Sequence, residues 1–498
     1  MTAADVPVPA PHEEGIALEK GLKTGALGFV SSVVIGVAST APGYSLAASL
    51  GFVVIAVGFQ APAALLVAFV PMFLIAGSYY SMNRVDPDCG TTFTWVTKGI
   101  GPKSGWISGW ALLLADILVM ASLSQIAGQY TFLLFGADSL ANSVFWVTVI
   151  GVIWIVVMTW ICYVGIELSA KTQWFLLGAE IVTLALFAVI ALAKVYAGKF
   201  PDSVDPSLSW LNPFALSGSA LTAGVLACIF IYWGWDTAVA VNEETEDATR
   251  TPGIAAVVST LLLLAIYIGV SYAAIAVHGT KFLEVNADEV LNPLGKDVMP
   301  WGLDKLLIIA ILTSASASTQ TTILPGTRAA LSMASHGAAP KRFASINPKR
   351  LTPGYATIVY GIISVVYYVI LTAVSQNIIY DSISATGLMI VFYLGITGVA
   401  CVIYFRKALF NDLRTFALAG LGPALGAIMM AYIFVKSVID QYNPDNSYSG
   451  KALLGMGPPL TIALLGFLLG LILMGLQWWS NPAFFKRKRE VADAEMRL

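Results

Sequence analysis

Residues 230–236 read Phe-Ile-Tyr-Trp-Gly-Trp-Asp and interrupt a hydrophobic segment, about residues 218–241, that is otherwise long enough to cross a bilayer. Gly234 costs a helix interior about 1 kcal/mol, and a carboxylate such as Asp236 is expensive in hydrocarbon. Non-helical backbone at membrane depth is tolerated only where protein or a water-filled cavity surrounds it. The stretch therefore predicts a substrate cavity. Its candidate substrate-binding residues are Phe230, Tyr232, Trp233, Gly234 and Asp236, and for Tyr232, Trp233 and Trp235 the alternative is packing between helices.

The composition indicates that the whole chain lies in a membrane. Of its 498 residues, 57% are hydrophobic and only 11% are charged, which excludes an ordinary soluble domain. The sequence predicts an all-α polytopic membrane protein with about twelve transmembrane helices. We expect a solvated cytoplasmic N-terminal tail (1–24), a transmembrane transport domain (25–479) and a basic cytoplasmic C-terminal tail (480–498). Residues 1–24 lack the apolar core of a signal peptide, so the first span is predicted to be retained.

The distribution of basic residues predicts the orientation. If both termini lie on the same side of the membrane, most lysines and arginines fall in loops and tails on that side. Because cytoplasmic segments are enriched in Lys and Arg, we expect both termini to be cytoplasmic and the protein to be a multi-pass component of the cell (plasma) membrane.

The first span also contains an interruption, Ser39-Thr40-Ala41-Pro42-Gly43. Pro42 removes a backbone donor and Gly43 loosens the next turn, while hydroxyl groups can bond the freed carbonyls. A broken helix is therefore predicted, and a tolerated kink is the alternative. Ser39, Thr40 and Gly43 are candidate substrate-binding residues.

Three further spans carry polar residues. Asp116 lies in the third span and Glu180 in the fifth, and intramembrane acids mark functional sites unless a neighbouring helix merely hydrogen-bonds them. The eighth span is polar along one side, including Thr313 and Ser314. Such hydroxyls are ligands for an ion or contributors to packing. Asp116 joins the candidate substrate-binding set.

The two interrupted spans are the first and the sixth. Corresponding features five spans apart are typical of a 5+5 inverted repeat, the leucine-transporter-type fold, with the binding site between the breaks near the midplane. Two additional C-terminal helices fall outside this repeat.

Several motifs carry a family resemblance. Gly234-Trp235-Asp236 resembles a Gly-aromatic-Glu motif, and residues 243–252 resemble a Glu-Glu-Thr-x-Asn-Pro-x-Arg-x-x-Pro loop, although the Asn-Pro pair is missing. Pro87-Asp88-Cys89-Gly90 and Gly109-Trp110 are similar to motifs around the third helix. On these motifs the chain is identified as a member of the amino acid, polyamine and organocation (APC) transporter superfamily, of the amino acid permease type.

The resemblance implies an ion-coupling site. The sequence also departs from the family pattern at two places. Residues 39–43 offer fewer free donors than the family's Gly-Ser-Gly-like run, and Glu180 stands where proton-coupled relatives carry lysine, fifteen residues after Gly165. In sodium-coupled relatives a Thr-Ser pair on the eighth helix binds the ion, and Thr313 and Ser314 after Ala310 fit that pattern. The implied ion-coupling residues are Glu180, Ala310, Thr313 and Ser314, with sodium bound at Thr313 and Ser314 or a proton carried by Glu180.

The function expected is secondary active import of amino acids by alternating access, driven by a proton or sodium gradient. The alternative is an amine or polyamine (organocation) importer or exchanger, because the buried acids Asp116, Glu180 and Asp236 have no matching base nearby in sequence. With three histidines and no phosphate loop or nucleophile motif, an enzyme is not expected. The expected partners are the small-molecule substrate, the coupled ion and the lipid bilayer, with no cofactor and no nucleic acid.

Overall fold

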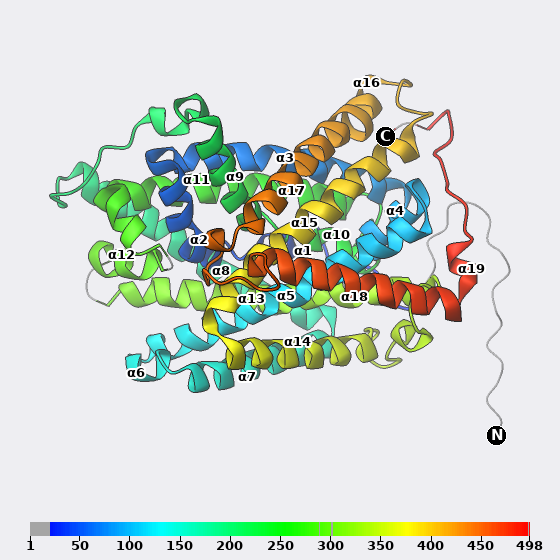
Figure 1. Ribbon diagram of the computed structural model, residues 1–498, viewed down its shortest axis with the longest axis horizontal. Helices are drawn as coiled ribbons and strands as arrows, with labels where there is room; N and C mark the ends of the chain where they lie inside the picture. The colour runs from blue at the N-terminus through cyan, green and yellow to red at the C-terminus, as the bar shows by residue number, and fades with distance from the viewer. Residues whose placement is uncertain (1–19, 288, 300–301, 497) are drawn as a thin grey trace.

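The computed structural model describes residues 20–287, 289–299, 302–496 and 498, and this part of the chain is helical throughout, without a β-sheet (Figure 1). Within it, ten helical stretches are long and apolar enough to cross a membrane. The first, Phe29–Val85, is 57 residues long and contains α1, α2 and α3. The all-helical, multi-span class predicted from the sequence is therefore confirmed.

The longer helices run roughly along the horizontal axis of Figure 1. They are α1 (Phe29–Ser39), α2 (Pro42–Val57), α3 (Ala61–Val85), α5 (Pro102–Leu134), α7 (Val144–Val164), α8 (Ile166–Tyr196), α9 (Gly218–Ile231), α11 (Thr251–Val285), α13 (Asp304–Ser335), α14 (Gly354–Val374), α15 (Gln376–Phe405), α17 (Gly422–Tyr442) and α18 (Pro458–Ser480). Short helices at their ends include α4 (Thr92–Gly99), α6 (Asp138–Ala141), α10 (Thr237–Ala240), α12 (Leu291–Val298), α16 (Leu413–Thr415) and α19 (Pro482–Phe485).

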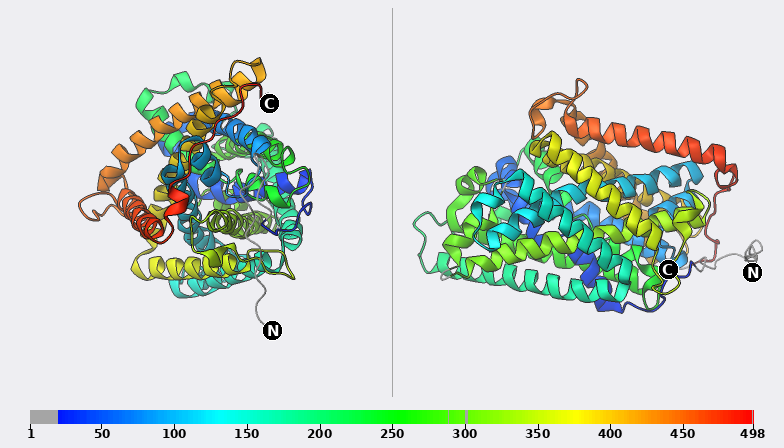
Figure 2. Two further views of the ribbon diagram at one scale, coloured as in Figure 1. Left: turned by 90° about the vertical axis from the view of Figure 1, so that its right-hand side faces the viewer. Right: turned by 90° about the horizontal axis from the view of Figure 1, so that it is seen from below.

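Helix α13 forms the centre of the bundle. It packs against α5, α8 and α1 and is buried along nearly its whole length. Helices α7 and α14 lie side by side at one edge of the bundle, and α17 and α18 lie at another (Figure 2). Their outward faces are apolar, as a lipid-facing surface requires. Such an arrangement places polar residues of α13 where only protein surrounds them.

The first break falls between α1 and α2. Helix α1 ends at Ser39, and Ala41 takes a left-handed conformation with φ 47° and ψ 65°. Pro42 then opens α2 at its first position, where a missing N–H costs nothing. The break predicted within residues 39–43 is confirmed, but the expectation that Gly43 loosens the backbone after Pro42 is wrong. Gly43 lies in the first turn of α2, because proline is suited to starting a helix rather than ending one.

The second break separates α9 from α10. Helix α9 ends at Ile231, Gly234 has φ +123°, and α10 begins at Thr237. A Cβ atom added to Gly234 would lie 2.6 Å from the carbonyl carbon of Ser39, so the two broken segments touch. The hydroxyl groups of Ser39 and Thr237 are hydrogen-bonded at 2.8 Å. The two interruptions predicted from the sequence therefore meet inside the protein.

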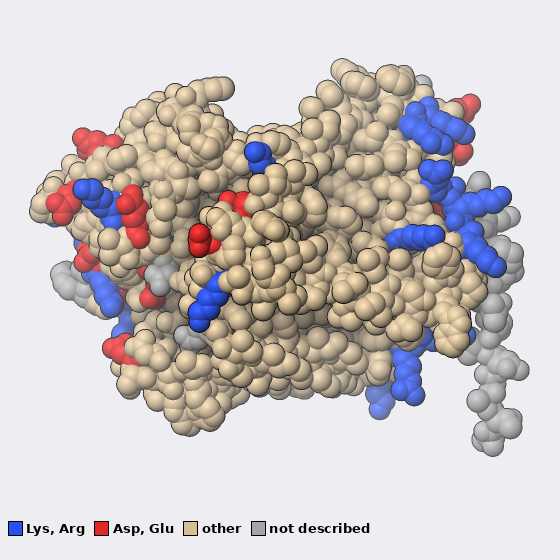
Figure 3. Space-filling view, viewed as in Figure 1, with Lys and Arg blue, Asp and Glu red and all other residues tan. Residues whose placement is uncertain are grey.

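Both terminal segments are partly packed rather than free. Of the expected tail, residues 1–24, residues 1–19 lie outside the described chain; in the remainder the side chains of Lys20 and Leu22 are buried, whereas Gly21 and Thr24 are exposed. At the other terminus Phe484 and Phe485 are buried. Lysines and arginines gather at this end of the bundle, on the right in Figure 3, and we call it the basic end.

The contact between the breaks makes the stability of the protein sensitive to substitution of Gly234. Gly234→Ala should lower the apparent unfolding temperature, because a side chain at this φ costs about 1–3 kcal/mol and its Cβ would overlap Ser39. The matched control is Gly178→Ala in α8, where nothing lies within 4 Å of the added methyl group and the change favours the helix by up to about 1 kcal/mol. Thermal unfolding in detergent measures both variants. An unchanged unfolding temperature for Gly234→Ala would contradict this close approach.

Candidate substrate and ion site

The start of α2 holds a buried carboxylate. The amide of Gly43 donates a 2.7 Å hydrogen bond to Glu180 Oε1 from α8, and the amide of Tyr44 donates to Ser314 Oγ from α13 at 3.0 Å. The free N–H groups and partial positive charge of a helix N-terminus favour an anion there. Glu180 is fully buried, and its second oxygen has no hydrogen-bond partner among the described residues. This oxygen is free to take a proton or to bind a cation.

The other predicted ion-coupling residues surround the same point. A Cβ atom added to Gly43 would lie 3.4 Å from Glu180 Oε1 and 3.5 Å from the carbonyl oxygen of Ala310. Thr313 Oγ1 donates to that same carbonyl at 3.0 Å. The structure thus brings together a carboxylate, a carbonyl and two hydroxyl groups, the oxygen ligands that hard cations prefer. The hydroxyl of Thr313 is turned toward its own helix, whereas that of Ser314 bridges to α2.

Asp236 lies at the second break within a chain of hydrogen bonds. Tyr393 in α15 donates to Asp236 Oδ2 at 2.7 Å, and the indole nitrogen of Trp233 donates to the Tyr393 hydroxyl at 2.5 Å. This chain fixes the Trp233 ring and leaves it 7% exposed. Asp236 therefore has a neutral donor as its partner instead of a base.

Asp116 occupies a comparable position on α5. It is 1% exposed, and its Oδ2 atom has no hydrogen-bond partner among the described residues. Gly326 of α13 faces it, since a Cβ atom there would lie 3.2 Å from Asp116 Oδ2. A side chain at position 326 would crowd this carboxyl group, so glycine keeps its surroundings open.

Phe230 separates the breaks from a hollow at the opposite end from the basic residues. The hollow has a volume of about 420 Å³, and its lining includes Phe230, Phe52, Tyr380 and Asp440. The Phe230 ring packs edge-on against Tyr44, with centroids 6.4 Å apart. It thus lies between the hollow and the start of α2, as expected of an aromatic cover.

Two of the neighbouring aromatic rings pack between helices. Tyr232 is fully buried against Tyr267 of α11, with ring centroids 5.0 Å apart, and Trp235 packs edge-on against Tyr79 of α3. Their rings are far from solvent because α3 and α11 cover them. In this conformation both rings pack between helices, and Tyr232 stays a candidate for the substrate site.

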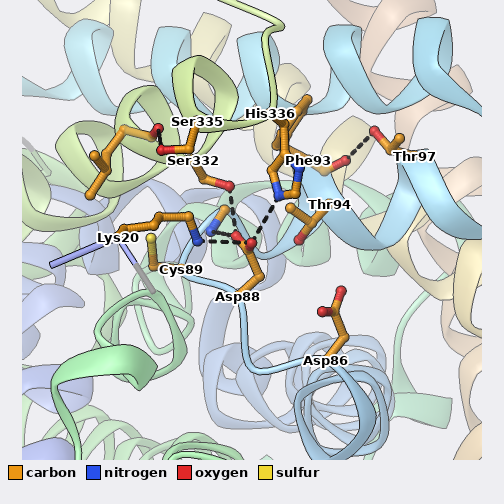
Figure 4. A network of polar contacts seen from close by, with 12 residues as sticks. Lys20, Asp86, Asp88, Cys89, Phe93, Thr94, Thr97, Ser332, Ser335 and His336 are labelled. Atoms are coloured by element: carbon orange, nitrogen blue, oxygen red, sulfur yellow. Dashed lines mark hydrogen bonds and ion pairs between the residues drawn. The ribbon is translucent and has the colours of Figure 1, made fainter. Parts of the chain in front are cut away.

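Buried ion pairs close the basic end of the bundle. Arg328 and Glu244 form a bidentate pair in which both side chains are fully buried. Lys20 binds Asp88 at 2.8 Å (Figure 4), and it also binds Glu243. Although burial disfavours the charged forms, Asp88 and its neighbours hold the pKa of Lys20 well above its usual value. This contact therefore remains an ion pair at neutral pH.

Asp88 collects most of these contacts. It accepts a hydrogen bond from Ser332 at 2.6 Å and lies 3.0 Å from His336 Nε2 (Figure 4). Despite its burial, Lys20 and His336 hold the pKa of Asp88 well below its usual value. Asp88, Cys89 and Glu243 lie close enough to share a metal ion, but the ammonium group of Lys20 supplies the positive charge that this cluster needs.

Sequence reasoning missed the residues that hold the breaks open. Ser318 donates to the Ser39 carbonyl at 2.9 Å, and Tyr267 donates to the Ile231 carbonyl at 2.6 Å. Ser318 lies four residues after Ser314, on the same face of α13, so helical spacing could have identified it. Nothing in the local sequence of Tyr267 indicates its partner 36 residues away.

Comparison with known proteins places the chain in a family. A family model described as "Amino acid permease" matches residues 25–484. The chain belongs to the amino acid permease family. This assignment confirms the resemblance to the APC superfamily and a multi-pass transporter, and members of the family are transporters rather than enzymes.

Individual relatives of this permease are distant. An uncharacterized transporter of Mycobacterium tuberculosis is 26% identical over 336 residues, 67% of this chain and 71% of the relative. The branched-chain amino acid permease BcaP of Lactococcus lactis is 23% identical, over 58% of this chain and 63% of the relative. The vacuolar cationic amino acid transporter 4 of Arabidopsis thaliana is 24% identical, over 60% of this chain and 50% of the relative. The named substrates differ, so the relatives leave the substrate of this permease open.

The ion pairs at the basic end make a prediction about Cys89, which is buried between them. Lys20→Gln removes the ammonium group that Asp88 and Glu243 share, leaving Asp88 with His336 alone and Glu243 without a basic partner among the described residues, a change that costs about 3–5 kcal/mol. We expect the basic end to open more often and Cys89 to be alkylated by a maleimide at least about tenfold faster. Mass spectrometry of the Cys89 peptide measures this rate.

Lys23→Gln is the matched control, because Lys23 pairs with Glu167 in an exposed ion pair of the kind that contributes little. Its Cys89 labelling should equal that of the unmodified protein. Equal labelling of both variants would contradict the proposed closure by Lys20.

Proposed function

We propose that this permease imports amino acids across the cell membrane by alternating access. The observation that carries this proposal is the meeting of two broken helices between an end closed by buried ion pairs and an end hollowed down to Phe230. Non-helical backbone enclosed by protein is where transporters of this kind bind substrate. In this conformation the hollow is on the outer side.

The topology proposed is twelve membrane crossings. Counting α1 with α2 and α9 with α10 as one crossing each, the crossings are α1–α2, α3, α5, α7, α8, α9–α10, α11, α13, α14, α15, α17 and α18. The first ten form the 5+5 inverted repeat, and α17 and α18 are additional. The basic end is cytoplasmic, in keeping with the excess of Lys and Arg there, and the membrane is the plasma membrane.

The substrate site proposed lies at the two breaks. Its residues are Ser39, Thr40, Gly43, Asp116, Phe230, Tyr232, Trp233, Gly234 and Asp236. The amides of Gly43 and Tyr44 already have acceptors in Glu180 and Ser314, so they are not free donors for a substrate carboxylate. The carbonyl-rich, acidic surroundings suit the ammonium group of an amino acid better than its carboxylate.

The same electrostatics favour a second candidate, an amine or polyamine carrier. The buried bases Arg328 and Lys20 are committed to Glu244, Asp88 and Glu243. Asp116, Asp236 and Glu180 are therefore three buried acids without a basic partner among the described residues. Counterflow of radiolabelled amino acids and polyamines in proteoliposomes separates the two substrates, and absence of counterflow with either class would refute a carrier.

The Phe230 ring is predicted to cover the bound substrate. Phe230→Ala should raise the KM for uptake roughly fivefold, because an aromatic contact contributes on the order of 1 kcal/mol, while protein abundance stays unchanged. Phe282→Ala is the matched control, since Phe282 is also half-buried but packs on His278, away from the hollow. Uptake kinetics in proteoliposomes measure both. An unaltered KM in Phe230→Ala would remove Phe230 from the site.

Glu180 is predicted to couple transport to an ion gradient, carrying a proton or binding sodium with Thr313 and Ser314. Glu180→Gln keeps the size and hydrogen-bonding capacity of the side chain but cannot titrate or supply a negative charge. We expect this variant to retain substrate exchange and to lose gradient-driven accumulation. Uptake with imposed sodium or pH gradients measures the loss and identifies the ion.

Glu167→Gln serves as control, because Glu167 lies on the same helix but is exposed. It should accumulate substrate normally. Full accumulation by Glu180→Gln would assign Glu180 a structural role in holding α2.

A further inference from the structure

The basic end contains a second hollow, remote from the broken helices. Its volume is about 470 Å³, and three segments of the chain form it: the α4–α5 junction, the end of α15 and the C-terminal segment. The charged residues in its lining are Arg406, Arg487, Lys488 and Arg489, and no acidic residue is among the described residues that line it. This hollow lies where Lys and Arg gather on the right of Figure 3.

The C-terminal segment is held in place on both sides of the hollow. Before it, the buried ring of Phe484 stacks on Phe93. After it, the amide of Glu490 donates to the carbonyl of Lys98 and the amide of Ala492 donates to that of Tyr404, both at 2.9 Å. The basic residues 487–489 are therefore fixed across the hollow by neighbouring backbone and packing contacts.

The positive charges of the hollow lack partners. Arg406, Lys488 and Arg489 form no hydrogen bond or ion pair within the described part of the chain. Arg487 is bound to His336, and the one acid nearby in sequence, Glu490, lies 3.7 Å from Lys98. Three unpaired cations beside one cavity create a site that favours an anion.

The start of α5 adds the positive end of a helix dipole to this site. Gly101 and Pro102 line the hollow, and α5 begins there without a side-chain cap. The amide of Gly101 donates to the carbonyl of Val96, and proline has no N–H group, so these two residues contribute no hydrogen bond of their own. The helix that begins here still carries partial positive charge at its N-terminus. Gly101 has φ +139°, and a Cβ atom there would lie at ordinary contact distance, 4.0 Å, from Arg489, so the basic segment lies close to the start of α5.

The hollow lies beside aromatic residues of the kind that mark a membrane surface. Trp478 and Trp479 at the end of α18 are 41% and 88% exposed. Lys103, next to Pro102, lies over the Trp478 ring at 4.2 Å. Tryptophan with lysine at a helix end is typical of the headgroup level of a bilayer.

We propose that this hollow binds a phosphate-bearing anion, with the headgroup of an anionic phospholipid as its source. Arg406, Lys488 and Arg489 would contact the phosphate oxygens, and the positive end of the α5 dipole would add to the attraction. The bound phosphate would connect α5, α15 and the C-terminal segment. This site is separate from the transported substrate and does not depend on its identity.

The test uses the purified full-length protein in a neutral detergent and phosphatidylglycerol as probe, with phosphatidylcholine as the comparison without net charge. Native mass spectrometry measures lipid retention. In the double variant Arg406→Gln/Lys488→Gln, phosphatidylglycerol should bind roughly thirtyfold more weakly. Arg406→Lys, which preserves the charge, should keep most of the binding. Unfolding temperatures establish that the variants are folded.

The matched control is Lys341→Gln/Arg342→Gln, which removes the same two residue types from an exposed segment between α13 and α14. Its affinity for phosphatidylglycerol should be unchanged. Equal losses of affinity for phosphatidylglycerol in both double variants would overturn the site, because the lipid would then be attracted by the total surface charge of the protein.

Inorganic phosphate distinguishes the source of the anion. If phosphatidylglycerol binds the unmodified protein selectively and millimolar phosphate does not compete, the site recognises a lipid headgroup. If phosphate competes with phosphatidylglycerol, and Arg406→Gln/Lys488→Gln abolishes this competition, the hollow is an anion site for a soluble phosphate compound. If neither probe distinguishes this variant from its control, the hollow is not an anion site.

Discussion

The structure depends on satisfying backbone groups freed at two helix breaks that have no access to bulk water. Each break exposes carbonyl groups whose burial without a hydrogen bond costs several kcal/mol. Side chains supply the missing donors: Ser318 for Ser39, Ser45 for Thr40 and Tyr267 for Ile231. Because these donors come from α2, α11 and α13, the breaks can persist only when the surrounding helices are packed. Local irregularity is thus maintained by tertiary structure.

Helix α13 has a double role for the same reason. Ser314 bonds the first turn of α2, and Ser318, one turn later, bonds the end of α1. One face of one helix therefore holds both sides of the first break, and Glu180 on α8 approaches the same break from another direction. A change in the charge of Glu180 acts directly on the start of α2. Under the coupling proposed above, an ion at Glu180 would alter the geometry of the proposed substrate site without contacting the substrate.

Much of this arrangement could be predicted from local chemistry, and the remainder depends on contacts distant in sequence. Gly234 and Pro42 indicate breaks because each disfavours a continuous helix, and Asp116, Glu180 and Asp236 stand out as acids in apolar spans. The first break precedes Pro42 instead of falling at Gly43, because proline favours the start of a helix. The burial of Lys20 depends on Asp88, 68 residues away, and Glu243, 223 residues away. Contacts between residues so far apart in the sequence produce no periodic pattern from which they could be predicted.

Under the alternating access proposed above, the two ends of the bundle differ in what must change. At the end facing Phe230, aromatic rings lie between the hollow and the breaks, and a ring can rotate without separating an ion pair. At the basic end, opening must separate Arg328 from Glu244 and Lys20 from Asp88, charges that are costly to leave buried and unpaired. Water entering with the opening would hydrate these charges and offset that cost. Separation of the pairs and solvation of the inner cavity must therefore occur together, which favours a concerted transition over a gradual leak.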